Sequence, residues 1–525
     1  MKNKYIKSLG INIHPVVFFS SILIILSIVI STLLNLSQAA QTFETIQSFI
    51  INKLSWFYIL TVNIILGFSI YLIFSKYGKI YIGGKNVKPD FTYWSWFSML
   101  FSAGMGIGLV FYSVAEPIFH YISPPYGEGN SIESAKTAMQ YTFFHWGLHA
   151  WGIYAVLALA LAFFSYNQGL PLTIRSIFYP LLGEKIYGHI GNVIDITATV
   201  ATLFGLTTSL GIGVKQINAG LNHLFGIPEN ISIQIILIIS ITTLATISVV
   251  LGLKKGIRRL SIVNMGIAML LMCFVFLCGP TIYLLNAFLQ NIGQYGSQII
   301  EMSFWTEVYE QSDWQKSWTI FYWAWWIAWS PFVAMFIARI SKGRTVREFL
   351  LSVLLIPSLL TFIWITIFGN TAIYQDMVLK YDIVNAVNEN ISVALFVMLN
   401  NLPLSFITSL LGVFLIITFF VTSSDSASLV IDIITSGGNT NPPTIQRIFW
   451  AVTEGLVAIV LLVGGGLIAL QTASIITGLF FAVILPLILV FMGFTVSGGV
   501  FIGIFVGIFS WFFGVIARFI YKLLG

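Results

Sequence analysis

Aromatic side chains crowd one apolar stretch of the sequence, from Tyr322 to Pro331. At about 100° per residue, four of the rings share an arc of about 100° on a helix: Tyr322, Trp325, Trp326 and Trp329. Tryptophan usually marks the membrane interface, but this density ahead of an embedded proline fits an interface belt poorly. Because ring faces attract cations, the run predicts one wall of an aromatic cage, suited to a quaternary ammonium group.

A second aromatic group lies in the apolar run 139–165, which carries Trp146, Trp151 and Tyr154. On a continuous helix these rings fall at about 0°, 140° and 80°, and so share one broad face. The pattern predicts that this helix supplies the opposite wall of the cage.

Glycine occurs at every second position in the run Ser102-Ala103-Gly104-Met105-Gly106-Ile107-Gly108. Each glycine costs a helix about 1 kcal/mol relative to alanine. Two interpretations stay open: close packing of helices through small residues, or a broken helix whose free carbonyl groups bind a cation. We expect Glu116-Pro117 to end this helix at the outer face.

Hydroxyl groups and one acid gather in the apolar run 402–431, from Thr422 to Ser428 around Asp425. The hydroxyls either bond back to their own helical turn or act as oxygen ligands for a small cation, and acids inside a membrane usually serve function. Asp195 and Glu454 also lie near or within apolar runs; a helix-end charge is an alternative for each, and we assign a function to neither. His145 and His149 have the spacing of a metal pair but point away from the tryptophans, and no third ligand is evident.

The elements that must position these residues are membrane helices. Of the 525 residues 58% are hydrophobic and only 8% are charged, against about a quarter charged in a globular protein. With a mean hydropathy of +0.93, the composition excludes a soluble domain, a nucleic-acid-binding module and a disulfide scaffold. The net charge of +6 therefore reports membrane topology.

Twelve runs are long enough to cross a bilayer: 16–36, 56–75, 93–115, 139–165, 190–214, 231–252, 261–287, 317–338, 350–374, 402–431, 446–466 and 471–494. With the N-terminus inside, eighteen Lys and Arg residues fall in inner loops and five in outer loops. We expect the first run to be retained, although Ser37 to Ala40 resembles a cleavage site. A further run, 497–517, either crosses the membrane or lies at its interface.

Together these segments resemble the betaine/choline/carnitine transporter family over about residues 10–495. The resemblance is carried by Gly104 to Gly108 with Ala115-Glu116-Pro117, by His145 to Tyr154, and by Trp323 to Arg344. It implies an all-α polytopic fold of about twelve transmembrane helices with two inverted five-helix repeats, of the amino-acid/sodium symporter type. The implied units are 1–92 with two additional helices, repeats 93–287 and 317–494, a connecting segment 288–316, and the extra C-terminal segment 495–525.

The resemblance also implies site residues. The trimethylammonium group would bind at Trp146, Trp151, Tyr154 and Trp326, with Trp325 as a neighbour, Trp329 on the inward path, and Gly104, Gly106 and Gly108 on the broken helix. One sodium ion would be held by Ser102, Met105, Phe419, Thr422 and Ser423, and Phe111 and Arg339 would be outer and inner gates. A second sodium site would use Thr202 and Phe332, but Leu206 stands where the family has threonine, beside Thr207 and Thr208.

The implied function is import of a quaternary-ammonium solute, most consistent with glycine betaine, by sodium symport with alternating access. Gly108, where some proton-coupled choline-type relatives carry aspartate, favours sodium and a zwitterion. Choline, carnitine or another osmolyte, with proton coupling or exchange, is the alternative within the family. A membrane-embedded enzyme using His145 and His149, and a channel, are the competing classes.

The implied partners are sodium as the coupling ion, membrane lipid and two further copies in a homotrimer, with no other cofactor and no nucleic acid. The expected location is the cytoplasmic (plasma) membrane, with the N-terminus inside. Because the family's long charged tails are missing from this sequence, we do not expect osmosensing through a tail.

Overall fold

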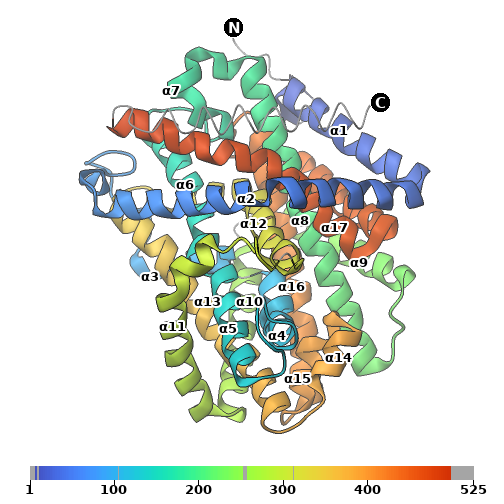
Figure 1. Cartoon of the computed structure of the whole chain (residues 1–525). Helices are drawn as coiled ribbons and strands as arrows, with labels where there is room; N and C mark the ends of the chain where they lie inside the picture. The colour runs from blue at the N-terminus through green and yellow to red at the C-terminus, as the bar shows by residue number, and fades with distance from the viewer. Residues whose placement is uncertain (1–5, 9–10, 105, 252–256, 311, 498–525) are drawn as a thin grey trace.

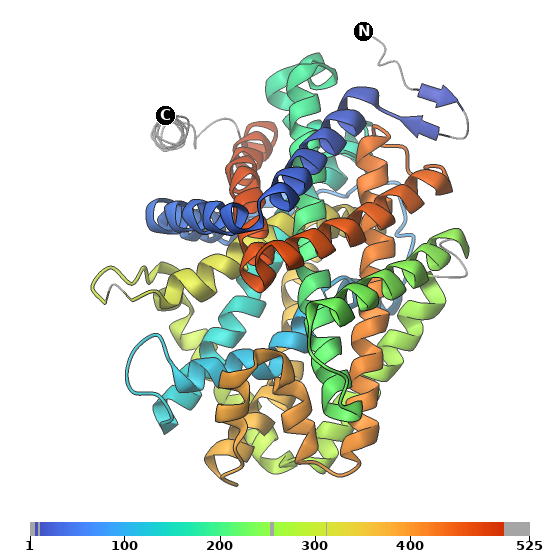
Figure 2. The ribbon, with the colours of Figure 1, turned by 90° about the vertical axis from the view of Figure 1, so that its right-hand side faces the viewer.

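A computed structural model of the chain describes residues 6–8, 11–104, 106–251, 257–310 and 312–497. Apart from one short hairpin, the regular structure of these residues is helical (Figure 1). The hairpin pairs β1 (Ile6–Ser8) antiparallel with β2 (Ile11–Ile13) and lies at one end of the molecule (Figure 2). The predicted all-α polytopic fold is therefore confirmed. The run 497–517 lies outside the described residues, apart from its first position.

The two N-terminal helices differ greatly in length. α1 (Pro15–Leu34) begins at His14, whose ring accepts a hydrogen bond from the Val17 N–H, and has proline in its first turn. α2 (Leu36–Phe74) has 39 residues, roughly 58 Å of helix and nearly twice the hydrocarbon thickness. It crosses in front of the interior helices in Figure 1. The predicted span 56–75 is thus only the second half of α2.

The remaining helices follow in chain order. They are α3 (Tyr93–Gly104), α4 (Ile107–Ile122), α5 (Ile132–Trp146), α6 (Leu148–Ala162), α7 (Tyr179–Leu182), α8 (His189–Phe225), α9 (Ile231–Leu251), α10 (Ile257–Cys278), α11 (Thr281–Phe304), α12 (Phe321–Ile340), α13 (Val346–Met377), α14 (Ile383–Glu389), α15 (Ala394–Asn400), α16 (Ser405–Thr435) and α17 (Thr444–Ser497). Short 3-10 and π turns connect several of them, including the π turn Lys316–Ile320 that leads into α12.

Eleven of the described helical stretches are long and apolar enough to cross a membrane. They coincide with the predicted runs except for 93–115, which the structure divides into α3 and α4. The predicted spans 446–466 and 471–494 are two parts of α17, joined at a kink where Gly466 adopts a φ of +60°. The division into two five-helix repeats stays a prediction.

Two expectations about helix ends are wrong. The predicted span 261–287 ends at Cys278, and α11 occupies most of the segment that was expected to be a connection. α4 does not end at Glu116-Pro117 but continues to Ile122. Proline displaces the carbonyl group four residues earlier, and α13 fits against this irregularity because Gly369 has no side chain: a Cβ there would lie 3.0 Å from the Ser113 carbonyl oxygen.

The core lies around α12, which packs against α6, α8 and α17. Seventeen of its residues are buried, including Pro331 in its middle. α8 and α16 run side by side through much of the height of the molecule (Figure 2). α12 therefore places its aromatic run at the centre of the helix bundle, where α6 faces it directly.

Candidate functional site

An enclosed aromatic cavity of ≈ 20 Å³ lies between α5, α6, α12 and α13. Its lining residues are Trp146, Ala150, Trp151, Tyr154, Trp326, Trp329 and Thr361. None of these side chains carries a charge. The structure thus brings together five of the seven aromatic residues that the sequence pattern assigned to the cage, without Tyr322 and Trp325.

The rings meet nearly at right angles. Trp326 lies with its ring centroid 4.9 Å from that of Trp146 at 79°, and 6.1 Å from that of Tyr154 at 83°. Trp151 and Tyr154 are 5.7 Å apart at 79°. In such pairs the edge of one ring meets the face of the next, and ring faces that border a cavity attract a cation. We name these lining residues the aromatic box.

Hydrogen bonds at the indole nitrogen atoms hold three of the rings in place. Trp146 donates to the Glu116 carboxylate at 2.7 Å, Trp326 to the His145 carbonyl at 3.0 Å, and Trp329 to the Gly205 carbonyl at 2.7 Å. Each ring is thereby tied at its polar edge, which leaves its face for the cavity.

A break in the helix at Gly147 shapes one wall. Gly147 separates α5 from α6 with φ −97° and ψ −139°. A Cβ there would lie 2.6 Å from the Phe143 carbonyl oxygen and 2.7 Å from the Phe362 ring, so only glycine fits. The predicted continuous helix is therefore wrong, because α5 and α6 are separate helices. Trp146, Trp151 and Tyr154 nevertheless line one cavity, as predicted.

Trp325 lies behind the box instead of lining it. Its ring stacks on Trp326 at 5.3 Å and on Phe321 at 5.4 Å. Gly108 lies against the same ring, because a Cβ at this position would come within 2.4 Å of Trp325. Gly108 thus bears on the box only through Trp325.

The glycine-rich segment forms a broken helix, the second of the two interpretations above. Gly104 is the last residue of α3, and Gly106 is the extended residue that precedes α4. Met105 lies outside the described residues, as do the side-chain surroundings of Ser102. The cation ligands expected on this segment therefore stay predictions.

The α16 half of the first expected sodium site is described. The Thr422 hydroxyl donates to the carbonyl oxygens of Thr418 and Phe419 in its own helix, at 3.0 and 3.2 Å. It also accepts a hydrogen bond from the Asn264 amide of α10 at 3.1 Å. Ser423 follows it and is half-buried. Asn264 is a polar neighbour that sequence reasoning missed, because it lies alone in an apolar run.

The hydroxyl cluster on α16 divides into two faces. Ser424 and Ser428 donate to the Glu454 carboxylate of α17 at 2.8 and 3.0 Å. Asp425 accepts from Ser248 of α9 at 2.8 Å. Glu454 is therefore a buried member of a hydrogen-bond network, not a helix-end charge, and these two serines face away from Thr422.

The residues of the second expected sodium site are only partly suited to it. The Thr202 hydroxyl is buried and has no hydrogen-bond partner among the described residues, and Phe332 packs on Trp329 at 5.4 Å. Thr207 bonds back to the Phe204 carbonyl, and Thr208 to the Leu470 carbonyl. A donating hydroxyl keeps its oxygen lone pairs, so these bonds do not by themselves exclude a ligand, but Thr208 is directed at Leu470 and Ser474 of α17.

Neither expected gate residue lines the aromatic box. Phe111 is buried in α4, with its ring 4.8 Å from that of Tyr112. Arg339 is half-buried in the last turn of α12. Their gating roles stay predictions.

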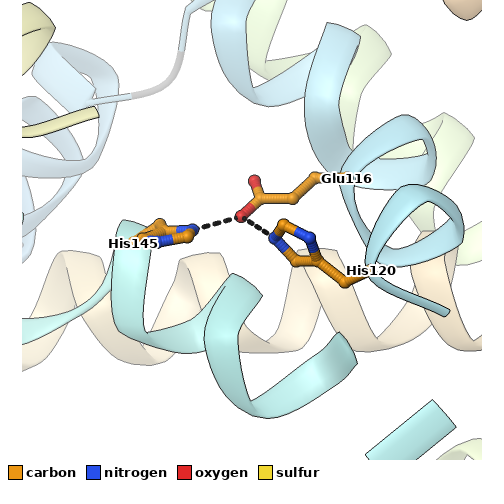
Figure 3. Close-up of side chains that lie close together, drawn as sticks. All are labelled: Glu116, His120 and His145. Atoms are coloured by element: carbon orange, nitrogen blue, oxygen red, sulfur yellow. Dashed lines mark hydrogen bonds and ion pairs between the residues drawn. The ribbon is translucent and has the colours of Figure 1, made fainter. Parts of the chain in front are cut away.

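Glu116 is the residue whose place sequence reasoning missed. Its carboxylate is fully buried, and one oxygen lies 2.6 Å from His145 Nδ1 and 3.2 Å from His120 Nε2 (Figure 3). The other oxygen accepts from Trp146 and, at 2.5 Å, from the Tyr322 hydroxyl. The available signal in the sequence is an acid followed four residues later by a histidine in an apolar run. The proline directly after Glu116 instead suggests the end of a helix.

These three side chains have the composition of a metal site, but their spacing is that of hydrogen bonds. Ligand atoms about 2.0–2.1 Å from a tetrahedral ion are roughly 3.3 Å apart, whereas the His145 contact is 2.6 Å. The second oxygen is engaged by Trp146 and Tyr322. His149 contacts the Ser303 hydroxyl at 2.9 Å, whereas His145 contacts Glu116 and Thr319.

Membrane-crossing helices with broken segments around a central aromatic box define a membrane transporter of the discontinuous-helix kind. Residues 16–497 match the betaine/carnitine/choline family of transporters, and the chain belongs to this family. The resemblance seen in the sequence is confirmed. The protein is a multi-pass membrane transporter, not an enzyme.

Curated relatives align over most of their length. A glycine betaine transporter of Acinetobacter baylyi is 47% identical over 481 residues, which cover 91% of this chain and 72% of the relative. A glycine betaine/proline/choline transporter of Vibrio parahaemolyticus is 46% identical, covering 91% and 89%. A glycine betaine transporter of Bacillus subtilis is 48% identical, covering 87% and 88%.

Proposed function

We propose that this protein imports glycine betaine, a quaternary-ammonium zwitterion, by sodium symport. The observation that carries the proposal is the uncharged aromatic box. A trimethylammonium group offers no hydrogen-bond donor and is recognised by ring faces, at about 0.5–2 kcal/mol for each contact. The names of the relatives support betaine among such solutes.

The aromatic box is too small for betaine in this structure, so the proposed transport cycle includes its opening. A cavity of ≈ 20 Å³ has room for about one water molecule, so the rings must part to admit betaine. Sodium would order the break between α3 and α4 against Thr422 and Ser423, complete the box and let the loaded site turn inward. Each inward charge gains about 2.3 kcal/mol per 100 mV of membrane potential, which drives accumulation of a neutral zwitterion.

Uptake of labelled glycine betaine into proteoliposomes tests the function directly. We expect concentrative uptake with an inward sodium gradient and little without one. Uptake that ignores sodium but follows a proton gradient would replace the coupling ion and keep the box. Failure of betaine to be taken up or to compete under any gradient would overturn the proposal.

Choline is the second candidate, because the Vibrio relative is named for it as well. Both solutes carry the same ammonium head, so the box alone does not separate them. Gly108, where some choline-type relatives carry aspartate, supplies no negative charge to balance the net positive charge of choline, which favours the zwitterion. Competition by unlabelled choline ranks the two: inhibition as strong as that by betaine would favour choline.

Removing both α16 hydroxyls of the sodium site should raise the sodium requirement. For Thr422→Ala with Ser423→Ala we expect about a tenfold higher sodium concentration at half-maximal uptake, equivalent to about 1.4 kcal/mol. Ser424→Ala with Ser428→Ala is the matched control, because it deletes two hydroxyls that face Glu454 on the same helix. Equal sodium dependence in the two double variants would contradict the site.

The sodium dependence of the parent protein should be that of a single ion. Leu206 supplies no ligand where the family has threonine, and the Thr208 hydroxyl is directed at Leu470 and Ser474 of α17. We therefore expect a Hill coefficient for sodium close to one, measured from initial rates of uptake. A coefficient near two that falls to one in Thr202→Val would instead establish a second ion at Thr202.

We also propose a homotrimer in the cytoplasmic membrane with the N-terminus inside. The excess of Lys and Arg in the inner loops supports this orientation. A reporter fused to the N-terminus and the mass of the purified protein in nanodiscs test the orientation and the trimer separately.

A further inference from the structure

The aromatic box carries no charge of its own, but a carboxylate lies directly behind it. Glu116 accepts a hydrogen bond from the indole nitrogen of Trp146, a wall of the box, at 2.7 Å. Among the described residues its ion-pair contacts are with His120 and His145 and none is with lysine or arginine. The structure therefore places a buried acid, without a lysine or arginine partner in the described part of the chain, directly beside the proposed cation site.

The groups around Glu116 can satisfy an ionised carboxylate. Indole N–H can only donate, so one oxygen must accept from Trp146. Tyr322 and, with a proton on the facing nitrogen of each, the two histidines can together supply three more donors, enough for the roughly four acceptor positions of a carboxylate. His145 Nε2 lies 2.9 Å from the Thr319 hydroxyl, so a neutral ring with its proton on Nδ1 satisfies both contacts. The negative charge is then hydrogen-bonded but not neutralised.

We propose that Glu116 makes the aromatic box selective for a cation, by holding the Trp146 ring and by placing an uncompensated negative charge one indole away from the bound ammonium group. This rests on the proposed function of the box. Burial of an unpaired charge is unfavourable, and a cation on the far side of the ring offsets that cost. Glu116 is thus a positioning and selectivity residue that does not touch the solute.

The size of the effect follows from the distance. An ammonium group over the Trp146 ring would lie roughly 8 Å from the carboxylate, and unit charges at that distance interact appreciably at an effective dielectric constant of about 20. The interaction corresponds to about tenfold to thirtyfold in a binding constant. An uncharged group of the same shape gains none of it.

The test compares glycine betaine with its carbon analogue 3,3-dimethylbutanoate, which has a tert-butyl group in place of the trimethylammonium group. Each is measured as a competitor of labelled betaine, and the ratio of their inhibition constants is the readout. A ratio does not depend on how much folded protein is recovered. In Glu116→Gln we expect the preference for betaine over the analogue to fall about tenfold.

Glutamine can make the contacts of Glu116 at the four neighbouring side chains, although the His120 Nδ1–H is then left without a partner among the described residues. The glutamine carbonyl oxygen accepts from Trp146 and Tyr322, and its amide donates to the two histidines, whose neutral rings each offer an acceptor nitrogen. Glu454→Gln is the matched control, because Glu454 is an equally buried acid held by two serine hydroxyls away from the box. We expect its ratio to equal that of the parent.

An unchanged ratio in Glu116→Gln would overturn the inference, and so would an equal fall in Glu454→Gln. Should Glu116→Gln not reach the membrane, Glu116→Asp keeps the charge but ends one methylene short of Trp146. We then expect weaker betaine binding with the ratio retained, and a collapsed ratio would contradict the proposal. If the parent itself does not bind betaine, the proposed function fails, not the role of Glu116 alone.

Discussion

Trp326→Ala should lower the affinity for glycine betaine by at least about a hundredfold. Trp326 is the central ring of the box. It lies edge to face with Trp146 and Tyr154 and stacks on Trp325. Its removal deletes a cation–π contact of about 0.5–2 kcal/mol and opens the box to water, which weakens the remaining contacts. Equilibrium binding of labelled betaine to purified protein measures the loss.

Two controls separate binding from folding. Trp450→Ala deletes a buried indole that packs on Phe18 and Phe449 and does not line the box. Deleting a buried tryptophan costs about 3–5 kcal/mol of folding free energy, so both alanine variants should melt earlier, but only Trp326→Ala should lose betaine. Trp326→Phe keeps a ring face and should retain part of the affinity. Betaine affinity unchanged in Trp326→Ala would refute the aromatic box.

The fold could be predicted largely from apolar runs, because a bilayer forces every crossing segment to be a long helix. The same criterion, a long apolar run, does not detect α11. Asn286, Gln290 and Gln294 lower its hydropathy, so a search for membrane spans passes over it although the segment is helical. The end predicted at Pro117 was wrong because a neighbouring helix can accommodate a proline through a residue such as Gly369.

The aromatic box could be predicted because its residue types are rare and dense. The helical pattern alone could not separate Trp326, which lines the cavity, from Trp325 behind it, because both lie in the same arc of the helix; only the family resemblance set Trp325 apart as a neighbour. The sequence also could not show the role of Glu116, whose four partners come from α4, α5 and α12. Such a network exists only once the helices are packed.

The helix break at Gly147 is a second feature that could not be predicted from the sequence, and substitution of this glycine should have a large effect on transport. In the sequence, one glycine in an apolar run indicates only close packing. In the structure its missing side chain sets the angle between α5 and α6, and hence the position of Trp146 relative to Trp151 and Tyr154. We expect Gly147→Ala to abolish concentrative betaine uptake.

The physical reason is that the new methyl group has nowhere to go. It would meet the Phe143 carbonyl oxygen, which is backbone, and the Phe362 ring, which is stacked on Phe143 at 4.1 Å. The two helices must therefore shift apart, and a box with room for about one water molecule does not keep its shape when a wall moves. Betaine binding and thermal melting of the same purified sample would record the loss.

Gly266→Ala is the matched control, since it places the same methyl group on membrane helix α10 with nothing within 4 Å. Alanine is favoured over glycine in a helix by about 1 kcal/mol, so this variant should melt no earlier than the parent and bind betaine normally. If Gly147→Ala also bound betaine normally, the break would be a packing feature and the box would tolerate movement of α6 against α5.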